Sequence, residues 1–156
     1  MSEIENKMLQ LGYTLPASVT PGGNYVPTVT VSSTGLVYTS GHVSQDSDGN
    51  LITGKLGDEV SVEEGYEAAK VTAVNLLGSL KSEVGDLDRI ERIVKVLCMV
   101  NCVPELAKHP AVANGASDLF VELFGDKGRH TRSAVGVVAL PFNVCVEIEM
   151  IVQIVS

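Results

Sequence analysis

The end of the chain alternates strictly between two kinds of side chain, and this pattern constrains the fold more than any other. If residues 144–155 form a β-strand, successive side chains point to opposite faces of the sheet. One face is then entirely apolar: Val144, Val146, Ile148, Met150, Val152 and Ile154. The other face is mixed: Cys145, Glu147, Glu149, Ile151, Gln153 and Val155. The apolar face must pack beneath other elements of the fold.

Two amphipathic segments are the candidates for that cover. Residues 61–84 carry an apolar stripe at helical spacing, begin with Ser61 and Glu64 in the pattern of a capping box, and end at Gly85. A second helix begins at Pro110 and runs to residue 124, where a glycine follows. The sequence therefore predicts two helices packed on one face of a sheet.

The remaining segments complete an α+β domain. Residues 3–12 predict a short leading helix, 29–31 and 36–38 a hairpin, and 93–100 a buried strand. Strands at 132–139 and 144–155 follow, and we expect them to pair as a hairpin about Pro141-Phe142. The prediction is one domain over 1–156, in which 1–20 form an N-terminal helix stub and loop. No predicted helix remains for the mixed face of the last strand, so we expect this face to contact other copies of the chain.

An excess of acidic side chains limits the partners of the chain. Eleven Lys and Arg stand against 19 Asp and Glu, which gives a formal charge of −8, and such a chain repels the phosphates of nucleic acids. No run approaches the roughly 18 apolar residues of a membrane span, and the N-terminus lacks the order of a secretory signal. We expect neither a nucleic-acid nor a membrane partner. Three cysteines cannot all pair within one chain, which favours a cytoplasmic location.

No pattern for a phosphate loop, a metal or a cofactor is present in the sequence. Neither GxxxxGK[ST] nor GxGxxG occurs. Cys98 and Cys102 lack a second ligand pair at zinc-finger spacing, and His42, His109 and His130 are far apart in sequence. We expect no metal and no cofactor, and we interpret the cysteines, Cys145 included, as buried inert thiols.

Arg132 and Glu147 are the candidate pair for chemistry. Arg132 opens a predicted strand, and Glu147 lies on the mixed face of the last strand. A guanidinium can hold a carboxylate through two hydrogen bonds, and a nearby carboxylate can orient a water molecule. From the residues alone, the alternative of a surface arginine and a solvated glutamate stays open.

The residues around this pair carry a longer pattern: Thr131-Arg132-Ser133, Val135, Val137, Leu140-Pro141, Val144 and Val146-Glu147-Ile148-Glu149. Residues 38–42 read YTSGH and residues 23–25 read GNY. Together these segments resemble the RidA/YjgF family of reactive-intermediate deaminases, in its C-terminal signature, its TSGQ strand end and its GPY loop. The order of the predicted elements is also similar, from about residue 20 to residue 155.

The resemblance implies a chorismate-mutase-like fold, a homotrimeric barrel and sites in the clefts between subunits. It implies cofactor-free hydrolysis of 2-imino acids and their enamine tautomers, such as 2-iminobutanoate and 2-iminopropanoate, to 2-oxo acids and ammonia. By position, Arg132 would hold the substrate carboxylate and Glu147 would position and activate the water. Tyr25 and Ser40 would line the cleft. The strand residues Ser133 and Ala134 would also contact the substrate.

Several departures from the family pattern indicate a distinct branch. Ala134 stands where many deaminases carry cysteine, Asn24 replaces the loop proline, and segments 109–118 and 125–131 differ. Two other functions are alternatives. One is a trimer that binds a small carboxylate without turnover, as a sensor or regulator. The other is a ribonuclease or translation inhibitor, which the acidic composition disfavours.

Overall fold

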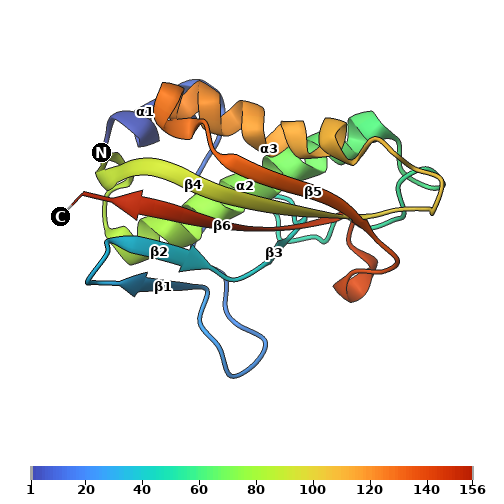
Figure 1. Cartoon of the computed structure of the whole chain (residues 1–156), viewed down its shortest axis with the longest axis horizontal. Helices are drawn as coiled ribbons and strands as arrows, with labels where there is room; N and C mark the ends of the chain where they lie inside the picture. Colours follow the sequence, from blue (N-terminus) through green and yellow to red (C-terminus); the bar gives the residue numbers. More distant parts are fainter. Residues whose placement is uncertain (1, 156) are drawn as a thin grey trace.

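This computed structural model describes residues 2–155. The molecule is built on one mixed β-sheet (Figure 1). Its strands are β1 (Thr28–Val31), β2 (Leu36–Thr39), β3 (His42–Val43), β4 (Ile90–Asn101), β5 (Thr131–Val137) and β6 (Val146–Ile154). The order across the sheet is β1-β2-β6-β4-β5, and β3 also pairs with β6. Strands β4 and β5 run parallel, whereas the other pairs are antiparallel.

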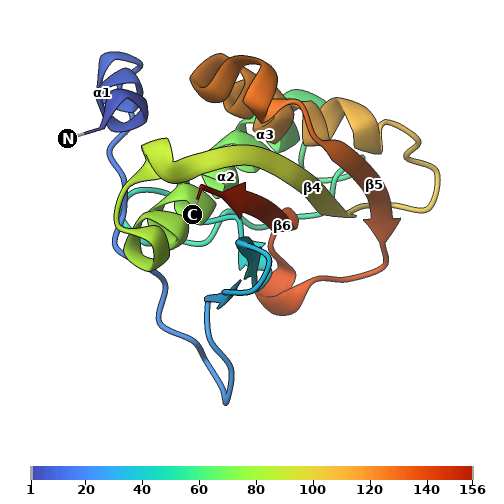
Figure 2. The same cartoon turned by 60° about the vertical axis from the view of Figure 1, so that its left-hand side comes forward.

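Helices α2 (Val62–Val84) and α3 (His109–Phe124) cover one face of this sheet, as the sequence predicts (Figure 2). A Cβ at Gly115 of α3 would collide with the backbone carbonyl of Tyr66 in α2, so this glycine lets the two helices approach closely. A shorter helix, α1 (Glu3–Gln10), precedes them, and three 3-10 turns connect other elements: η1 (Leu87–Arg89), η2 (Gly125–Gly128) and η3 (Pro141–Asn143). None of the helices in the described part of the chain is long and apolar enough to cross a membrane.

The ends of the helices follow the predicted capping signals. The Ser61 hydroxyl accepts the backbone N–H of Glu64 at 3.1 Å, and the Glu64 carboxylate accepts the N–H of Ser61 at 2.8 Å. Gly85 ends α2 with a φ of +81°, a value that glycine adopts without the strain of a Cβ. The capping box and the glycine stop are therefore confirmed.

The C-terminal strands do not form the predicted hairpin. Strand β4 lies between them, and its residue Val96 pairs with Arg132 of β5 on one side and Met150 of β6 on the other. The reason is the crossover β4-α3-β5, since such a connection places its two parallel strands side by side. Strand β4 is also longer than the predicted 93–100, because irregular pairing near its start breaks the alternation of burial there.

The sheet face opposite the helices, which we call the open sheet face, has no covering element in residues 2–155. Strand register places a broad set of apolar side chains on it: Val29, Val31, Leu36, Tyr38, Val43, Leu97, Met99, Val135, Val137 and Ile151. Cys145 is not part of this face, contrary to expectation, and is fully buried. Its N–H donates to the Ile52 carbonyl at 3.0 Å and to Ser44 Oγ at 3.2 Å, because the segment before α2 covers this end of the last strand.

Candidate functional site

Arg132 lies on the edge strand β5 and reaches the flank of α3. Its Nη1 donates to Asn114 Oδ1 at 2.8 Å and to Ser117 Oγ at 3.0 Å, and its Nη2 lies 3.5 Å from the Pro110 carbonyl oxygen. Within residues 2–155, Nε–H and one Nη2–H of the guanidinium have no hydrogen-bond partner. Two donors of a guanidinium whose position is fixed can bind a carboxylate.

The next two residues of β5 point to different sides of the sheet. Ala134 pairs with the fully buried Cys98 and faces the helices, as Arg132 does. Ser133 faces the open sheet, where its Oγ accepts a hydrogen bond from Lys95 Nζ at 3.1 Å. Of these predicted contact residues, only Ala134 therefore shares a face with Arg132.

Glu147 lies half-buried on the open sheet face near the start of β6. Its carboxylate lies against Gly41, where any Cβ would collide with Oε1. Burial raises the pKa of the Glu147 carboxyl above its usual range, and the charge of Glu149 adds to this effect. A carboxylate with a raised pKa takes up a proton more readily, which suits a general base.

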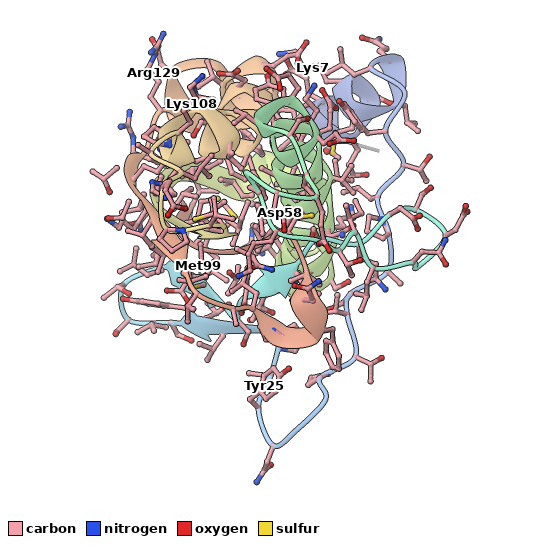
Figure 3. All side chains as sticks on the ribbon, turned by 90° about the vertical axis from the view of Figure 1, so that its right-hand side faces the viewer. Lys7, Tyr25, Asp58, Met99, Lys108 and Arg129 are labelled. Carbon is pink, nitrogen blue, oxygen red and sulfur yellow. The ribbon has the colours of Figure 1, made fainter. Side chains whose placement is uncertain are left out.

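Ser40 and Tyr25 lie at the same end of the sheet as Glu147. The hydroxyl of Ser40 donates to the Val26 carbonyl at 2.6 Å, and its N–H donates to the Pro27 carbonyl at 2.7 Å. These bonds tie the loop that carries Tyr25 to the end of β2. Tyr25 is 57% exposed and lies on the loop that projects from the body of the molecule (Figure 3).

A single chain does not bring the predicted site residues together. Tyr25, Ser40 and Glu147 form one group, while Arg132 and Ala134 form another on the far side of β4. Two strand spacings of about 4.8 Å separate β5 from β6, and the two groups face opposite sides of the sheet. Figure 3 shows Tyr25 at one end of the molecule and Arg129, shortly before Arg132, at the opposite end. A site that uses both groups must be built from two copies.

Three residues around Arg132 were not predicted to belong to the site: Asn114, Ser117 and His130. Asn114 and Ser117 are three positions apart in α3 and thus lie on one flank of it. Two polar residues at this spacing in an otherwise apolar helix are a sequence pattern that could have indicated them. Ser117 Oγ lies 2.9 Å from His130 Nε2, and His130 Nδ1 lies 2.6 Å from the Gly128 carbonyl oxygen. These contacts extend the surroundings of Arg132 beyond β5.

The three cysteines are buried. Burial raises the pKa of the Cys98 thiol to about 12 and that of Cys145 to about 11, and it also raises the pKa of Cys102. Cys102 Sγ lies 3.5 Å from His109 Nε2, beside a cavity of about 510 Å³. No group of three or more His, Cys, Asp or Glu in residues 2–155 has the arrangement of a metal site.

We expect all three thiols of the native protein to react slowly with an aromatic disulfide reagent, because the protonated, buried thiol is a poor nucleophile. Cys102, at 7% exposure, should react first, and Cys98 and Cys145 only on unfolding. Mass spectrometry of the labelled chain, with denatured protein as the control for full labelling, measures this order. Fast stoichiometric labelling of the native chain would contradict the interpretation as inert thiols.

Comparison with known proteins extends over nearly the whole chain. A model of the family described as "YjgF/chorismate_mutase-like, putative endoribonuclease" matches residues 5–154. Protein TCP17 of Trypanosoma cruzi is 40% identical over 146 residues, which are 93% of this chain and 90% of that protein.

Solved structures share this fold, and two of them illustrate the similarity. Atu1372 from Agrobacterium tumefaciens, a protein of unknown function, is 42% identical, with a TM-score of 0.88 over 98% of this chain and 94% of that chain. A "putative endoribonuclease" from Shewanella oneidensis MR-1 is 30% identical, with a TM-score of 0.92 over 98% of this chain and 100% of that chain. The match of sequence and fold along nearly the full length shows that this chain belongs to the YjgF/chorismate-mutase-like family.

Proposed function

We propose that this protein hydrolyses 2-imino acids and their enamine tautomers to 2-oxo acids and ammonia. The observation that carries the proposal is the guanidinium of Arg132, which α3 holds in place while two N–H donors remain for a substrate carboxylate. The half-buried Glu147 carboxylate, with its raised pKa, supplies the base.

This reaction requires little of the protein beyond the orientation of the substrate and of the attacking water. The imine carbon is already electrophilic, so a water oxygen adds to it while Glu147 takes a proton from that water and passes it on to the imine nitrogen. The resulting carbinolamine then loses ammonia, and its hydroxyl becomes the carbonyl of the 2-oxo acid. Holding the carboxylate at Arg132 places the imine carbon beside the water, and this gain in proximity lowers the barrier.

The proposed site requires at least two copies, and we propose a homotrimer. Support comes from the open sheet face, whose apolar side chains no element in residues 2–155 covers. Exposed apolar area of this kind is typical of contacts between subunits. A neighbouring copy would supply the Tyr25, Ser40 and Glu147 group opposite the Arg132 group of the first.

Replacing Ile151 with lysine at the centre of the open sheet face should dissociate the assembly, because a buried ammonium without a partner is costly. Light scattering at micromolar concentration should report a trimer for the wild type and a smaller species for Ile151→Lys. The matched control is Val138→Lys, since Val138 is 87% exposed beyond the end of β5. A monomeric wild type would contradict both the trimer and the shared site.

Ribonuclease activity, which the name of the Shewanella protein suggests for that protein, has weaker support in this chain. The formal charge of −8 opposes the binding of a polyanion. We expect no cleavage of single-stranded RNA by the same preparation that is used for the imine assay.

The decisive experiment generates the imine beside the protein. An amino-acid oxidase forms 2-iminopropanoate from alanine, or a dehydratase forms 2-iminobutanoate from threonine, and semicarbazide traps what remains. We expect the full chain to lower the trapped imine in proportion to its concentration. An unchanged rate of imine loss with both substrates would overturn the proposal, and pyruvate binding without turnover would favour a carboxylate-binding protein.

A further inference from the structure

A continuous chain of hydrogen bonds runs from η2 to the guanidinium of Arg132. Its links are Gly128 O to His130 Nδ1 at 2.6 Å, His130 Nε2 to Ser117 Oγ at 2.9 Å, and Ser117 Oγ to Arg132 Nη1 at 3.0 Å. The three side chains also line one cavity of about 290 Å³ between α3 and β5. The side chains behind the proposed carboxylate site are thus partly buried, and their hydrogen bonds link Arg132 to a titratable group, His130.

The direction of each bond follows from its partners. The Gly128 carbonyl can only accept, so Nδ1 of His130 carries the proton. In the neutral ring Nε2 then accepts, and the Ser117 hydroxyl donates to it. The hydroxyl oxygen in turn accepts from Arg132 Nη1, because a guanidinium has no acceptor. Neutral His130 thus orients Ser117, and Ser117 orients Arg132.

The surroundings of His130 favour its neutral form in the free protein. Burial lowers the pKa of His130, the bond to the Gly128 carbonyl raises it, and the charge of Arg132 lowers it. The Phe120 ring of α3 and the imidazole are arranged edge to face, with 5.8 Å between the ring centroids. The other charged groups at the cavity are Asp118 of α3, which accepts a hydrogen bond from Tyr66 at 2.8 Å, and Arg129 before β5.

We propose that Ser117 and His130 are positioning residues of the carboxylate site, which fix the Arg132 guanidinium and couple anion binding to proton uptake. The proposal rests on the proposed role of Arg132 as the carboxylate ligand. A bound carboxylate neutralises the charge that disfavours the imidazolium, so binding raises the proton affinity of His130. By reciprocity, protonated His130 strengthens carboxylate binding.

Calorimetric titration of the full chain with pyruvate from pH 8 to pH 5, at constant ionic strength, tests this coupling. We expect the wild type to bind pyruvate about three- to tenfold more tightly at pH 5 than at pH 8. This is the effect expected of one added positive charge, on His130, several ångströms from the bound carboxylate. His130→Gln should remove most of this difference. His109→Gln, which changes the histidine beside Cys102, is the matched control and should keep it.

The role of Ser117 has its own test. Ser117→Ala removes an acceptor from Nη1 and should weaken pyruvate binding at every pH, whereas Ser117→Thr keeps the hydroxyl and should restore it. The protonation of His130 can be measured directly by NMR. The titration midpoint of its imidazole ring resonance should move to higher pH when pyruvate is bound.

The possible outcomes separate this proposal from the proposed function. If the wild type binds no 2-oxo acid at any pH, the role of Arg132 fails and this proposal fails with it. If pyruvate binds but His130→Gln keeps the wild-type pH dependence, only the coupling through His130 is overturned. If the pH dependence of pyruvate binding instead disappears in Glu147→Gln, the proton is taken up by Glu147, and again only the coupling through His130 is overturned.

Discussion

Replacing Arg132 with alanine should abolish most turnover of 2-imino acids and weaken the binding of pyruvate about ten- to a hundredfold. The loss corresponds to hydrogen bonds to a charged group, each of which contributes about 1.5–3 kcal/mol. Arg132→Lys should recover little, because an ammonium keeps the charge but lacks the planar pair of donors. Calorimetry with pyruvate and the imine assay measure the two effects.

Arg129→Ala is the matched control, because Arg129 is exposed and within residues 2–155 forms an ion pair only with Asp126, at 3.3 Å. Thermal unfolding of the Arg132 variants should resemble the wild type, since water can reach Asn114 and Ser117 once the guanidinium is gone. If Arg132→Ala binds pyruvate as the wild type does, Arg132 is a surface arginine and the assignment from the family does not hold.

Replacing Glu147 with glutamine should remove turnover while pyruvate still binds. The amide keeps the size of the side chain and its place against Gly41 but cannot accept the proton of the attacking water. General-base catalysis typically contributes about 10²–10⁴-fold in rate, and we expect a loss in that range. Glu149→Gln, on the same strand and face, is the control and should retain most activity.

The same residue predicts the pH dependence of the rate. Glu147 acts as a base only when ionised, so turnover should fall as the pH drops through its pKa. Because burial and Glu149 raise this pKa, the loss should begin above the pH at which an ordinary glutamate titrates. A rate that is independent of pH in this region, or full activity of Glu147→Gln, would contradict the role of Glu147.

Local signals in the sequence predicted the helices and most of the strands, but not the short β3. The Ser61–Glu64 capping box and the glycines after both long helices depend on contacts and backbone conformations within a few residues, and the alternation of the last strand follows the two-residue repeat of a β-strand. Such contacts are encoded by neighbours along the chain, so periodicity and capping patterns predict them. Residue type singled out Arg132 and Glu147 as a candidate pair, and the family resemblance at residues 131–149 assigned a role to each.

The order of the strands was not predictable in this way. The hairpin expected between the last two strands is replaced by β4 between them, because the crossover through α3 requires β5 to lie beside β4. Arg132 of β5 and Glu147 of β6 therefore lie two strands apart, and the strand register places their side chains on opposite faces of the sheet. A site that uses both residues, such as the cleft between subunits that the family resemblance implies, would combine them from separate copies.

The sequence by itself thus determined the helices, most strands, the family and the two residues proposed for chemistry, since these depend on residue type and local spacing. Only the tertiary structure decided which residues surround them. Asn114 and Ser117 contact Arg132, and Ser117 also contacts His130, because α3 packs across the edge of β5. Gly41 meets Glu147 because β3 pairs with β6 across more than 100 residues of chain. Contacts of that range are set by the packing of whole elements, which no local pattern records.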